Sequence, residues 1–159
     1  MRNSGLRWLW IAVVVLLLDR LSKYYILQTF SPGDWLHVMD YFNLSLAYNR
    51  GAAFSLFAHA SGWQTWMFGS LAILVNVAIL FALTRLRAAQ AVVCIALAFI
   101  MGGSLGNLWD RLVYGHVIDF LDFYYKYSHF PTFNLADSAI CLGALLLFVD
   151  ALFLQRNKK

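Results

Sequence analysis

Four long apolar runs constrain this chain more than any other feature of its sequence. They lie at residues 8–27, 63–83, 88–108 and 135–154. About 20 apolar residues are enough to cross the hydrocarbon core of a bilayer as a helix. The chain is 62% hydrophobic and 13% charged, whereas charged residues make up about a quarter of a soluble domain. The sequence therefore predicts an all-α membrane protein with four transmembrane helices.

The positions of the Lys and Arg residues predict how these helices are oriented. Seven cations fall on one side of the predicted spans: Arg2, Arg7, Arg85, Arg87, Arg156, Lys158 and Lys159. The other five lie at the opposite ends of spans or in the opposite loops: Arg20, Lys23, Arg50, Arg111 and Lys126. Cytoplasmic loops carry an excess of Lys and Arg. We therefore expect both termini in the cytoplasm, and two outer loops at residues 28–62 and 109–134.

The first outer loop is predicted to form a small extracytoplasmic β-sheet. In residues 41–48, apolar side chains alternate with Asn43, Ser45 and Ala47, and this period of two is typical of a strand. The Asn-Arg-Gly sequence at residues 49–51 predicts a turn, and residues 52–57 predict a second strand. The second outer loop carries Pro131 and a run of aromatic residues.

The charge pattern and the cysteines exclude several functions. The net charge is +4, but the cations gather at segment ends and form no basic stripe, so we expect no nucleic acid partner. Cys94 and Cys141 both lie inside apolar runs. We expect them to be buried free thiols, and their spacing predicts neither a disulfide framework nor a metal site. We expect no cofactor.

Asp19 and Lys23 place two charges in the first predicted span. They are four residues apart and share one helix face. Ionisable residues inside a span usually face the bundle interior and pair there. Two interpretations are open: a buried structural ion pair, or a pair that shapes or charges a polar site.

The end of the third predicted span carries a second polar group. Gly102 and Gly106 form a small-xxx-small pattern, which allows helices to approach closely. Packing does not explain Asn107, Asp110 and Arg111, which follow directly. Asn107 and Arg111 share a helix face, and we expect them to brace a polar centre, with Arg111 forked onto a carboxylate.

Two carboxylates beside the last span are the strongest candidates for chemistry. Asp137 alone would suit the first turn of a helix capped by Asn134. Asp119 alone would be an ordinary interfacial acid, as Asp122 is expected to be. Together, one precedes the fourth span and the other lies in its first turn. Two adjacent carboxylates in a poorly solvated place share one proton, and aspartic proteases use this arrangement to activate water.

Five ordered sequence blocks carry a resemblance to a known family. They are DRLSK at 19–23, NRGAAFS at 49–55, GGSLGNLWDR at 102–111, VIDF at 117–120 and FNLADSAI at 133–140. Over nearly its whole length, the chain resembles lipoprotein signal peptidase, the type II signal peptidase of bacteria.

The resemblance implies a single integral membrane peptidase domain over residues 1–159, in the bacterial inner membrane with its active site at the periplasmic face. It implies an aspartic endopeptidase that removes the signal peptide from diacylglyceryl-modified prolipoproteins, cutting before the lipid-modified cysteine. The implied catalytic residues are Asp119 and Asp137. The implied substrate-binding and supporting residues are Asp19, Lys23, Asn49, Gly51, Asn107, Asp110, Arg111 and Asn134. The expected partners are these substrates and membrane lipid, and we expect a monomer.

Other functions fit the residues less well. A serine protease of the membrane needs Ser and His on separate spans, but all four His residues lie in predicted loops or at their edges: His37, His59, His116 and His129. A zinc protease needs H-E-x-x-H, and the sequence contains no Glu. A small transporter or proton relay using intramembrane carboxylates is the alternative outside the proteases. It would need polar residues through the whole membrane, whereas the acids cluster at one face.

Overall fold

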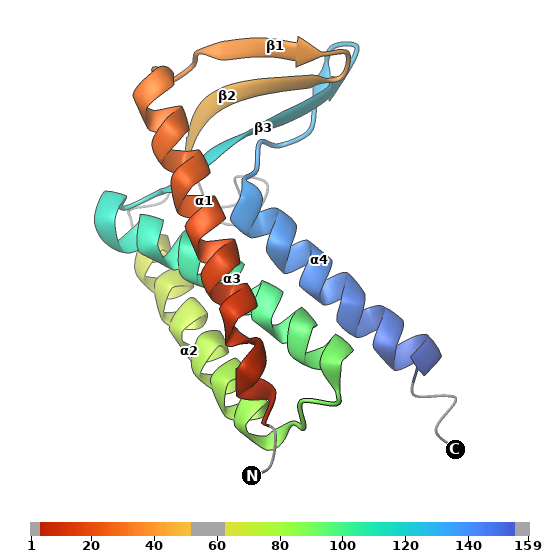
Figure 1. The fold of residues 1–159 in the computed structure, drawn as a ribbon. Coiled ribbons are helices and arrows are strands. Elements are labelled where there is room, and N and C mark those ends of the chain that lie inside the picture. Colours follow the sequence, from red (N-terminus) through yellow and green to blue (C-terminus); the bar gives the residue numbers. More distant parts are fainter. Residues whose placement is uncertain (1–3, 52–62, 155–159) are drawn as a thin grey trace.

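The bundle and its sheet occupy opposite ends of one elongated molecule (Figure 1). The structure is a computed structural model, and it describes residues 4–51 and 63–154. The four long helices are α1 (Leu9–Thr29), α2 (Trp63–Arg85), α3 (Ala91–Tyr114) and α4 (Leu135–Val149). α3 packs against the other three helices. α1 begins and α4 ends at the end of the bundle that lies away from the sheet.

The sheet is antiparallel, with its four strands in the order β1-β2-β3-β4. The strands are β1 (Trp35–Met39), β2 (Phe42–Asn49), β3 (Val117–Tyr125) and β4 (Ser128–His129). β2 confirms the strand predicted from alternation, whereas β1 and β3 were not predicted. The predicted strand at residues 52–57 lies outside the described residues. β2 and β3 pair although α2 and α3 separate them in the sequence, so the sheet joins the two outer loops.

α3 is longer at its second end than the hydropathy predicts. The apolar run ends at Leu108, but the helix continues to Tyr114. It ends there because Gly115 adopts a left-handed conformation (φ 74°), and its N–H donates to the Arg111 carbonyl at 3.1 Å. The helix therefore continues beyond the predicted third span, into the region expected to be the second outer loop. Asp110 and Arg111 lie on a rigid helix.

Three helices are long and apolar enough to cross a membrane among the residues described: Trp63–Arg85, Ala91–Tyr114 and Leu135–Leu152. The predicted count of four spans is not confirmed by this measure. α1 is also long, with 21 residues. It carries three charged residues, Asp19, Arg20 and Lys23, within less than two helical turns, so its hydropathy is lower. The protein is thus a mostly helical membrane protein with a small antiparallel sheet.

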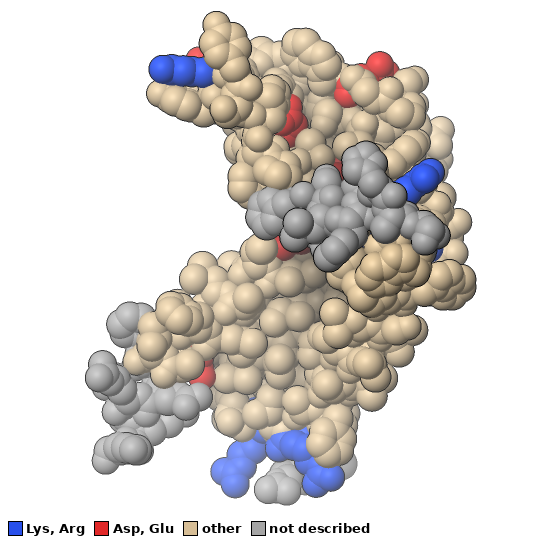
Figure 2. Space-filling model, turned by 180° about the vertical axis from the view of Figure 1, so that it is seen from behind, with Lys and Arg blue, Asp and Glu red and all other residues tan. Residues whose placement is uncertain are grey.

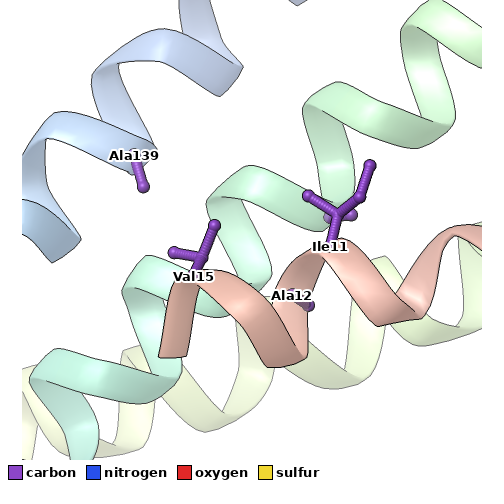
Figure 3. Packing of buried hydrophobic residues seen from close by; sticks show 5 residues of the cluster. Ile11, Ala12, Val15 and Ala139 are labelled. Atoms are coloured by element: carbon purple, nitrogen blue, oxygen red, sulfur yellow. The ribbon is translucent and has the colours of Figure 1, made fainter. Parts of the chain in front are cut away.

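Small residues bring α1, α3 and α4 close together. Ile11, Ala12 and Val15 of α1 form a buried cluster with Ala98 of α3 and Ala139 of α4. Figure 3 shows Ile11 and Val15 projecting from α1 towards the neighbouring helices. Side chains as small as alanine leave room for backbones to approach, which is how helices pack when lipid surrounds them.

Glycines on α3 sit at these helix contacts, as the small-xxx-small pattern predicted. A Cβ on Gly102 would lie 2.7 Å from the Ala12 carbonyl oxygen of α1. A Cβ on Gly106 would clash with the Asp19 carboxylate. The two glycines therefore fix the distance between α1 and α3, and with it the position of the charged residues at the sheet end.

Gly143→Ala is expected to destabilise the protein by about 1–3 kcal/mol, the usual range for overpacking. Its Cβ would lie 2.6 Å from the Ala96 carbonyl oxygen, a backbone atom that cannot rotate away. Gly69→Ala is the matched control, because the nearest atom to that Cβ is Leu108 Cδ1 at 3.8 Å. Thermal unfolding in detergent micelles measures both. Equal unfolding temperatures for the two variants would contradict the close α3–α4 contact.

Candidate active site

The first turn of α4 presents Asp137 in a capping box. Asn134 is the N-cap, and its side-chain oxygen accepts from the Asp137 backbone N–H at 3.0 Å. In return, Asp137 Oδ2 accepts from the Asn134 backbone N–H at 3.3 Å. This reciprocal pair satisfies two donors at the start of the helix. The predicted N-cap and first-turn positions are confirmed, and they hold the Asp137 carboxylate in one orientation.

Asp119 comes from β3 and meets the same asparagine. Its Oδ1 accepts from Asn134 Nδ2 at 2.6 Å, and its Oδ2 accepts from Asn49 Nδ2 at 3.0 Å. Asp119 is 1% exposed and Asn134 is fully buried. Asn134 therefore binds both carboxylates, Asp137 through its backbone N–H and Asp119 through its amide. The structure brings together the two carboxylates that the sequence singled out.

The surroundings of Asp119 favour its neutral form. Burial removes water that would solvate the charge, and the negative charge of Asp137 opposes a second one nearby. These two effects raise the pKa of Asp119 to about 7, although hydrogen bonds from Asn49 and Asn134 act in the opposite direction. Around neutral pH, both the protonated and the ionised form of Asp119 are therefore populated.

A cavity of about 560 Å³ opens beside this pair. Asp137 lines it together with four other polar residues: Asn49, Asn107, Arg111 and Ser138. Most of the remaining wall is apolar and comes from α4 and the segment before it: Phe130, Pro131, Thr132, Phe133, Ile140 and Cys141. An apolar cavity with a few converging polar groups is the usual form of a ligand site.

Behind the cavity lies a compact cluster of four charges. Lys23 Nζ lies 2.9 Å from Asp19 Oδ2 and 2.7 Å from Asp110 Oδ2. Arg20 Nη2 lies 2.6 Å from Asp110 Oδ1. The two cations balance the two anions, and Asp19, Lys23 and Asp110 are at most 1% exposed. The predicted Asp19–Lys23 pair is confirmed. Arg20 was not predicted, because its partner lies on another helix.

Asn107 connects this charged cluster to the carboxylate pair. Its Oδ1 accepts from Lys23 Nζ at 3.1 Å and from Asn134 Nδ2 at 3.2 Å. Its Nδ2 donates to Asp137 Oδ1 at 2.7 Å. The buried lysine thus orients the amide, and the amide orients Asp137. One hydrogen-bonded network therefore runs from α1 through α3 to the start of α4.

The aspartates of the charged cluster also hold backbone from two other elements. Asp19 Oδ1 accepts from the Ala136 N–H in the first turn of α4, at 3.1 Å. Asp110 Oδ2 accepts from the Ile118 N–H of β3, at 3.3 Å. These bonds fix the residues next to Asp137 and Asp119. The charged cluster therefore holds in place the backbone segments that carry the two carboxylates.

Arg111 lines the cavity, but the prediction that it binds a carboxylate was wrong. Its Nη1 donates to the Asn107 carbonyl at 3.1 Å, and its Nη2 to the Gly51 carbonyl at 3.4 Å. Among the described residues, Arg111 forms no ion pair with a carboxylate. Gly51 is held in turn by Asn49, whose Oδ1 accepts from the Gly51 N–H at 2.9 Å. Arg111 therefore ties the end of β2 to α3.

Two further expectations were wrong. Asp122 is not an ordinary interfacial acid, because it is 6% exposed and accepts from Asn43 Nδ2 at 3.0 Å. Cys94 is buried as predicted, but Cys141 is exposed on α4. Cys141 is one of the residues that line the cavity beside Asp137, whereas Ala139 and Gly143 on the same helix are buried. The described residues contain no group of three or more His, Cys or carboxylate side chains that would hold a metal ion.

Comparisons with known proteins show which family the chain is similar to. Residues 11–153 match the family described as Signal peptidase (SPase) II. A lipoprotein signal peptidase of Photorhabdus laumondii is 50% identical over 157 residues, which cover 99% of this chain and 93% of the relative. One from Escherichia coli is 49% identical, covering 99% and 96%. A solved structure of a bacterial membrane enzyme has a TM-score of 0.86 and 30% identity, covering 100% of this chain and 96% of that one.

The helical bundle, the apolar cavity and the converging polar groups define a membrane-embedded protein with a cavity that combines polar and apolar walls. Each match covers nearly the whole length of this chain and of the relative, so the similarity includes the helices, the sheet and the connecting segments. The chain belongs to the signal peptidase II family. It is therefore a membrane protease that takes part in lipoprotein processing. This result confirms the resemblance found in the sequence, and it disfavours the interpretation as a transporter.

Proposed function

We propose that the protein is an aspartic endopeptidase whose catalytic pair is Asp119 and Asp137. One observation carries the proposal: both carboxylates are held by Asn134 beside an apolar cavity, and the pKa of Asp119 is raised to about 7. A pair of interacting carboxylates that shares one proton supplies a base and an acid at the same time. The remaining polar residues have supporting roles, since they orient this pair or line the cavity.

In the proposed reaction, Asp137 carries the charge and Asp119 carries the shared proton. Asp137 lines the cavity, so it is placed to take a proton from a water as that water attacks the peptide carbonyl carbon. Asp119 donates its proton to the carbonyl oxygen. As the C–N bond breaks, Asp137 gives the proton that it took from water to the leaving amine. Asp119 takes a proton back from a hydroxyl group of the tetrahedral intermediate as the new carboxyl group forms, so Asp137 ends ionised and Asp119 ends protonated, as at the start.

The proposed substrate is a diacylglyceryl-modified prolipoprotein, cut before the lipid-modified cysteine. The cavity supports this choice because its lining combines a few polar groups with aromatic and aliphatic side chains. Acyl chains anchor a polypeptide at the membrane surface. An enzyme with its site at headgroup depth can therefore meet the scissile bond and still admit the water that hydrolysis needs.

The proposed placement has four spans, with α1 as the fourth membrane-crossing helix. Its charged residues Asp19 and Lys23 face inwards, whereas Leu17 and Leu21 are 54% and 65% exposed. Buried charge with exposed leucine suits a helix in lipid. Figure 2 shows Lys and Arg side chains gathered at the end of the molecule opposite the sheet. That end is proposed to be cytoplasmic, which puts the carboxylate pair and the sheet at the periplasmic face of the inner membrane.

Cleavage of a lipid-modified precursor by the purified protein tests this function. We expect mass spectrometry to show a single cut directly before the modified cysteine. The same polypeptide without the diacylglyceryl group is expected to be cut at least about a hundredfold less efficiently, because binding energy from a remote group supports the chemical step. Equal cleavage of both forms would contradict the lipid requirement. Absence of cleavage of either would contradict the proposed function.

The rate is expected to fall as the pH rises through about 7. Burial raises the pKa of Asp119 to about 7, so above that pH the pair loses its shared proton and has no acid left. Asn49 donates to Asp119 and thereby lowers its pKa. Asn49→Ala removes this bond, so the pKa rises and the decline moves to higher pH. The pH dependence of kcat measures the shift.

Asn76→Ala is the matched control for this shift. Asn76 is a buried asparagine on α2 that donates to Ser104 Oγ at 2.8 Å, away from the carboxylate pair. Its loss affects packing between α2 and α3 but not the environment of Asp119. A decline at the same pH in Asn49→Ala and in the wild type would show that Asp119 does not set it.

A further inference from the structure

A row of polar side chains crosses one face of the sheet, outside the site described above. His37 on β1, Asn43 on β2 and Asp122 on β3 lie directly opposite one another in the strand register. Asn43 Oδ1 lies 3.3 Å from His37 Nδ1, and Asn43 Nδ2 donates to Asp122 at 3.0 Å. His129 of β4 completes the row, with its Nδ1 2.8 Å from Asp122 Oδ1.

A β-bulge separates this row from the candidate active site. The register of β2 against β3 shifts between Leu44 and Ala47, so β2 has one extra residue there. Successive side chains of a strand point to opposite faces, and Asp119 and Asp122 are three residues apart on β3. The bulge lets β2 follow both of them, with Asn49 beside Asp119 on one face and Asn43 beside Asp122 on the other.

The polar row lines a second, larger cleft of about 930 Å³. Trp35 and Tyr124 also line it, and Tyr124 stacks on His129 with ring centroids 5.4 Å apart. The residues 130–132 line both this cleft and the cavity beside Asp137. One short segment therefore forms a wall common to the two spaces, and a chain that leaves the catalytic cavity past this segment reaches the cleft.

We propose that this cleft, which we call the sheet cleft, binds the extended polypeptide that follows the lipid-modified cysteine of the substrate. This inference rests on the proposed function. The two spaces adjoin each other at residues 130–132, so a chain that passes this segment runs from one space to the other. The chain on one side of the scissile bond stays in the membrane as signal peptide, so the chain on the other side is the part available to the sheet.

The chemistry of the cleft suits a polypeptide main chain. Each substrate residue brings one N–H donor and one carbonyl acceptor. The His129 side chain lines the cleft and is 56% exposed although its Nδ1 is bound to Asp122, so much of its ring is open to a ligand. The Tyr124 hydroxyl offers a donor and an acceptor, and Trp35 offers a broad apolar surface at 68% exposure. Aromatic side chains of this kind supply contact area without demanding one substrate sequence.

Two substrates of different length test the sheet cleft. Both carry the diacylglyceryl group, but the short one ends directly after the cysteine and the long one continues with a polar segment. For the wild type, we expect KM to be about tenfold lower for the long substrate, as buried aromatic contacts provide at an interface. In the double variant Trp35→Ala/Tyr124→Ala, this ratio is expected to fall to about one, with kcat for the long substrate unchanged.

Tyr125→Ala is the matched control, since Tyr125 neighbours Tyr124 on β3 but stacks on Tyr41 and does not line the cleft. It is expected to retain the wild-type ratio. A wild-type ratio of one, or a ratio unchanged in the double variant, would overturn the proposal. So would an equal loss on both substrates, which is the effect of a damaged sheet. If the wild type cuts neither substrate, the proposed function itself fails.

Crosslinking provides a readout that does not need turnover. Trp35→benzoylphenylalanine, combined with Asp119→Asn to keep the substrate intact, places a photoreactive group in the sheet cleft. We expect it to label the segment after the cysteine of the long substrate. Labelling of the signal peptide alone, or of phospholipid alone, would overturn the proposal. The wild type could fail to cut either substrate while the photoreactive variant still labels the segment after the cysteine. That result would support binding in the sheet cleft and contradict the proposed reaction.

Discussion

Asp119→Asn and Asp137→Asn are each expected to lower kcat for the lipid-modified precursor by about a thousandfold or more, the upper part of the range for general acid–base catalysis. Each substitution keeps the shape of the side chain and removes one titrating carboxyl. Asp137→Asn removes the base, and Asp119→Asn removes the acid. Because the two act as a unit, the double variant is expected to be hardly slower than either single one.

The loss must be separated from misfolding. Asn in place of Asp119 keeps one acceptor oxygen but meets Asn49 and Asn134, which both donate to the aspartate. Some stability is therefore lost, and thermal unfolding must show that the variants remain folded at the assay temperature. Asp40→Asn, in the exposed turn between β1 and β2, is the matched control and is expected to cut normally. Near-normal cleavage by either active-site variant would remove that carboxylate from the mechanism.

Local sequence spacing was sufficient to predict part of this site. Asn134 and Asp137 are three residues apart at the start of an apolar run, and this spacing predicts an N-cap followed by an acid in the first turn. Asp19 and Lys23 are four apart on a helix, which predicts their ion pair. Such pairs depend only on helix geometry. They were correct because both partners belong to the same element.

Contacts between distant elements were not accessible in the same way. Arg20 binds Asp110 on α3, and Asp122 on β3 binds Asn43 on β2. Both contacts depend on how helices cross and how strands align. The strand β3 contains aromatic and β-branched residues in VIDFLDFYY, a composition that favours a strand, but its polar residues Asp119 and Asp122 break simple alternation. The bulge in β2 that gives each a partner is a tertiary feature with no local signal of its own.

The fold was predictable where hydropathy and helix length agree. α2 begins at Trp63 and α4 at Leu135, as the apolar runs indicate. The apolar run and the helix length disagree in α3. The helix continues through Asn107, Asp110 and Arg111, because the residue that ends it is Gly115. Polar side chains are tolerated there since partners from α1, β3 and α4 surround them. A hydropathy scale weighs residues singly, so it cannot register such compensation.

Lys23→Met is expected to destabilise the protein by about 3–5 kcal/mol, the range for breaking a buried ion pair from one side. Lys23 is 1% exposed and lies between Asp19 and Asp110. Methionine fills a similar volume but leaves two buried carboxylates with Arg20 as the one remaining cation of the cluster. The free energy of unfolding in detergent micelles measures the loss. Arg85→Met, at an exposed arginine near the other end of the bundle, is the control and is expected to change stability by less than about 1 kcal/mol.

A double-mutant cycle distinguishes charge balance from simple packing. Asp110→Asn alone leaves an excess positive charge, and Lys23→Met alone an excess negative one, whereas the double variant keeps the cluster neutral. We therefore expect the double variant to lose at least about 1 kcal/mol less than the sum of the two single losses. Additive losses would mean that Lys23 contributes only volume. In that case its bond to Asn107 would have to account for any effect on cleavage, because Asn107 is the residue that passes the position of the charged cluster on to Asp137.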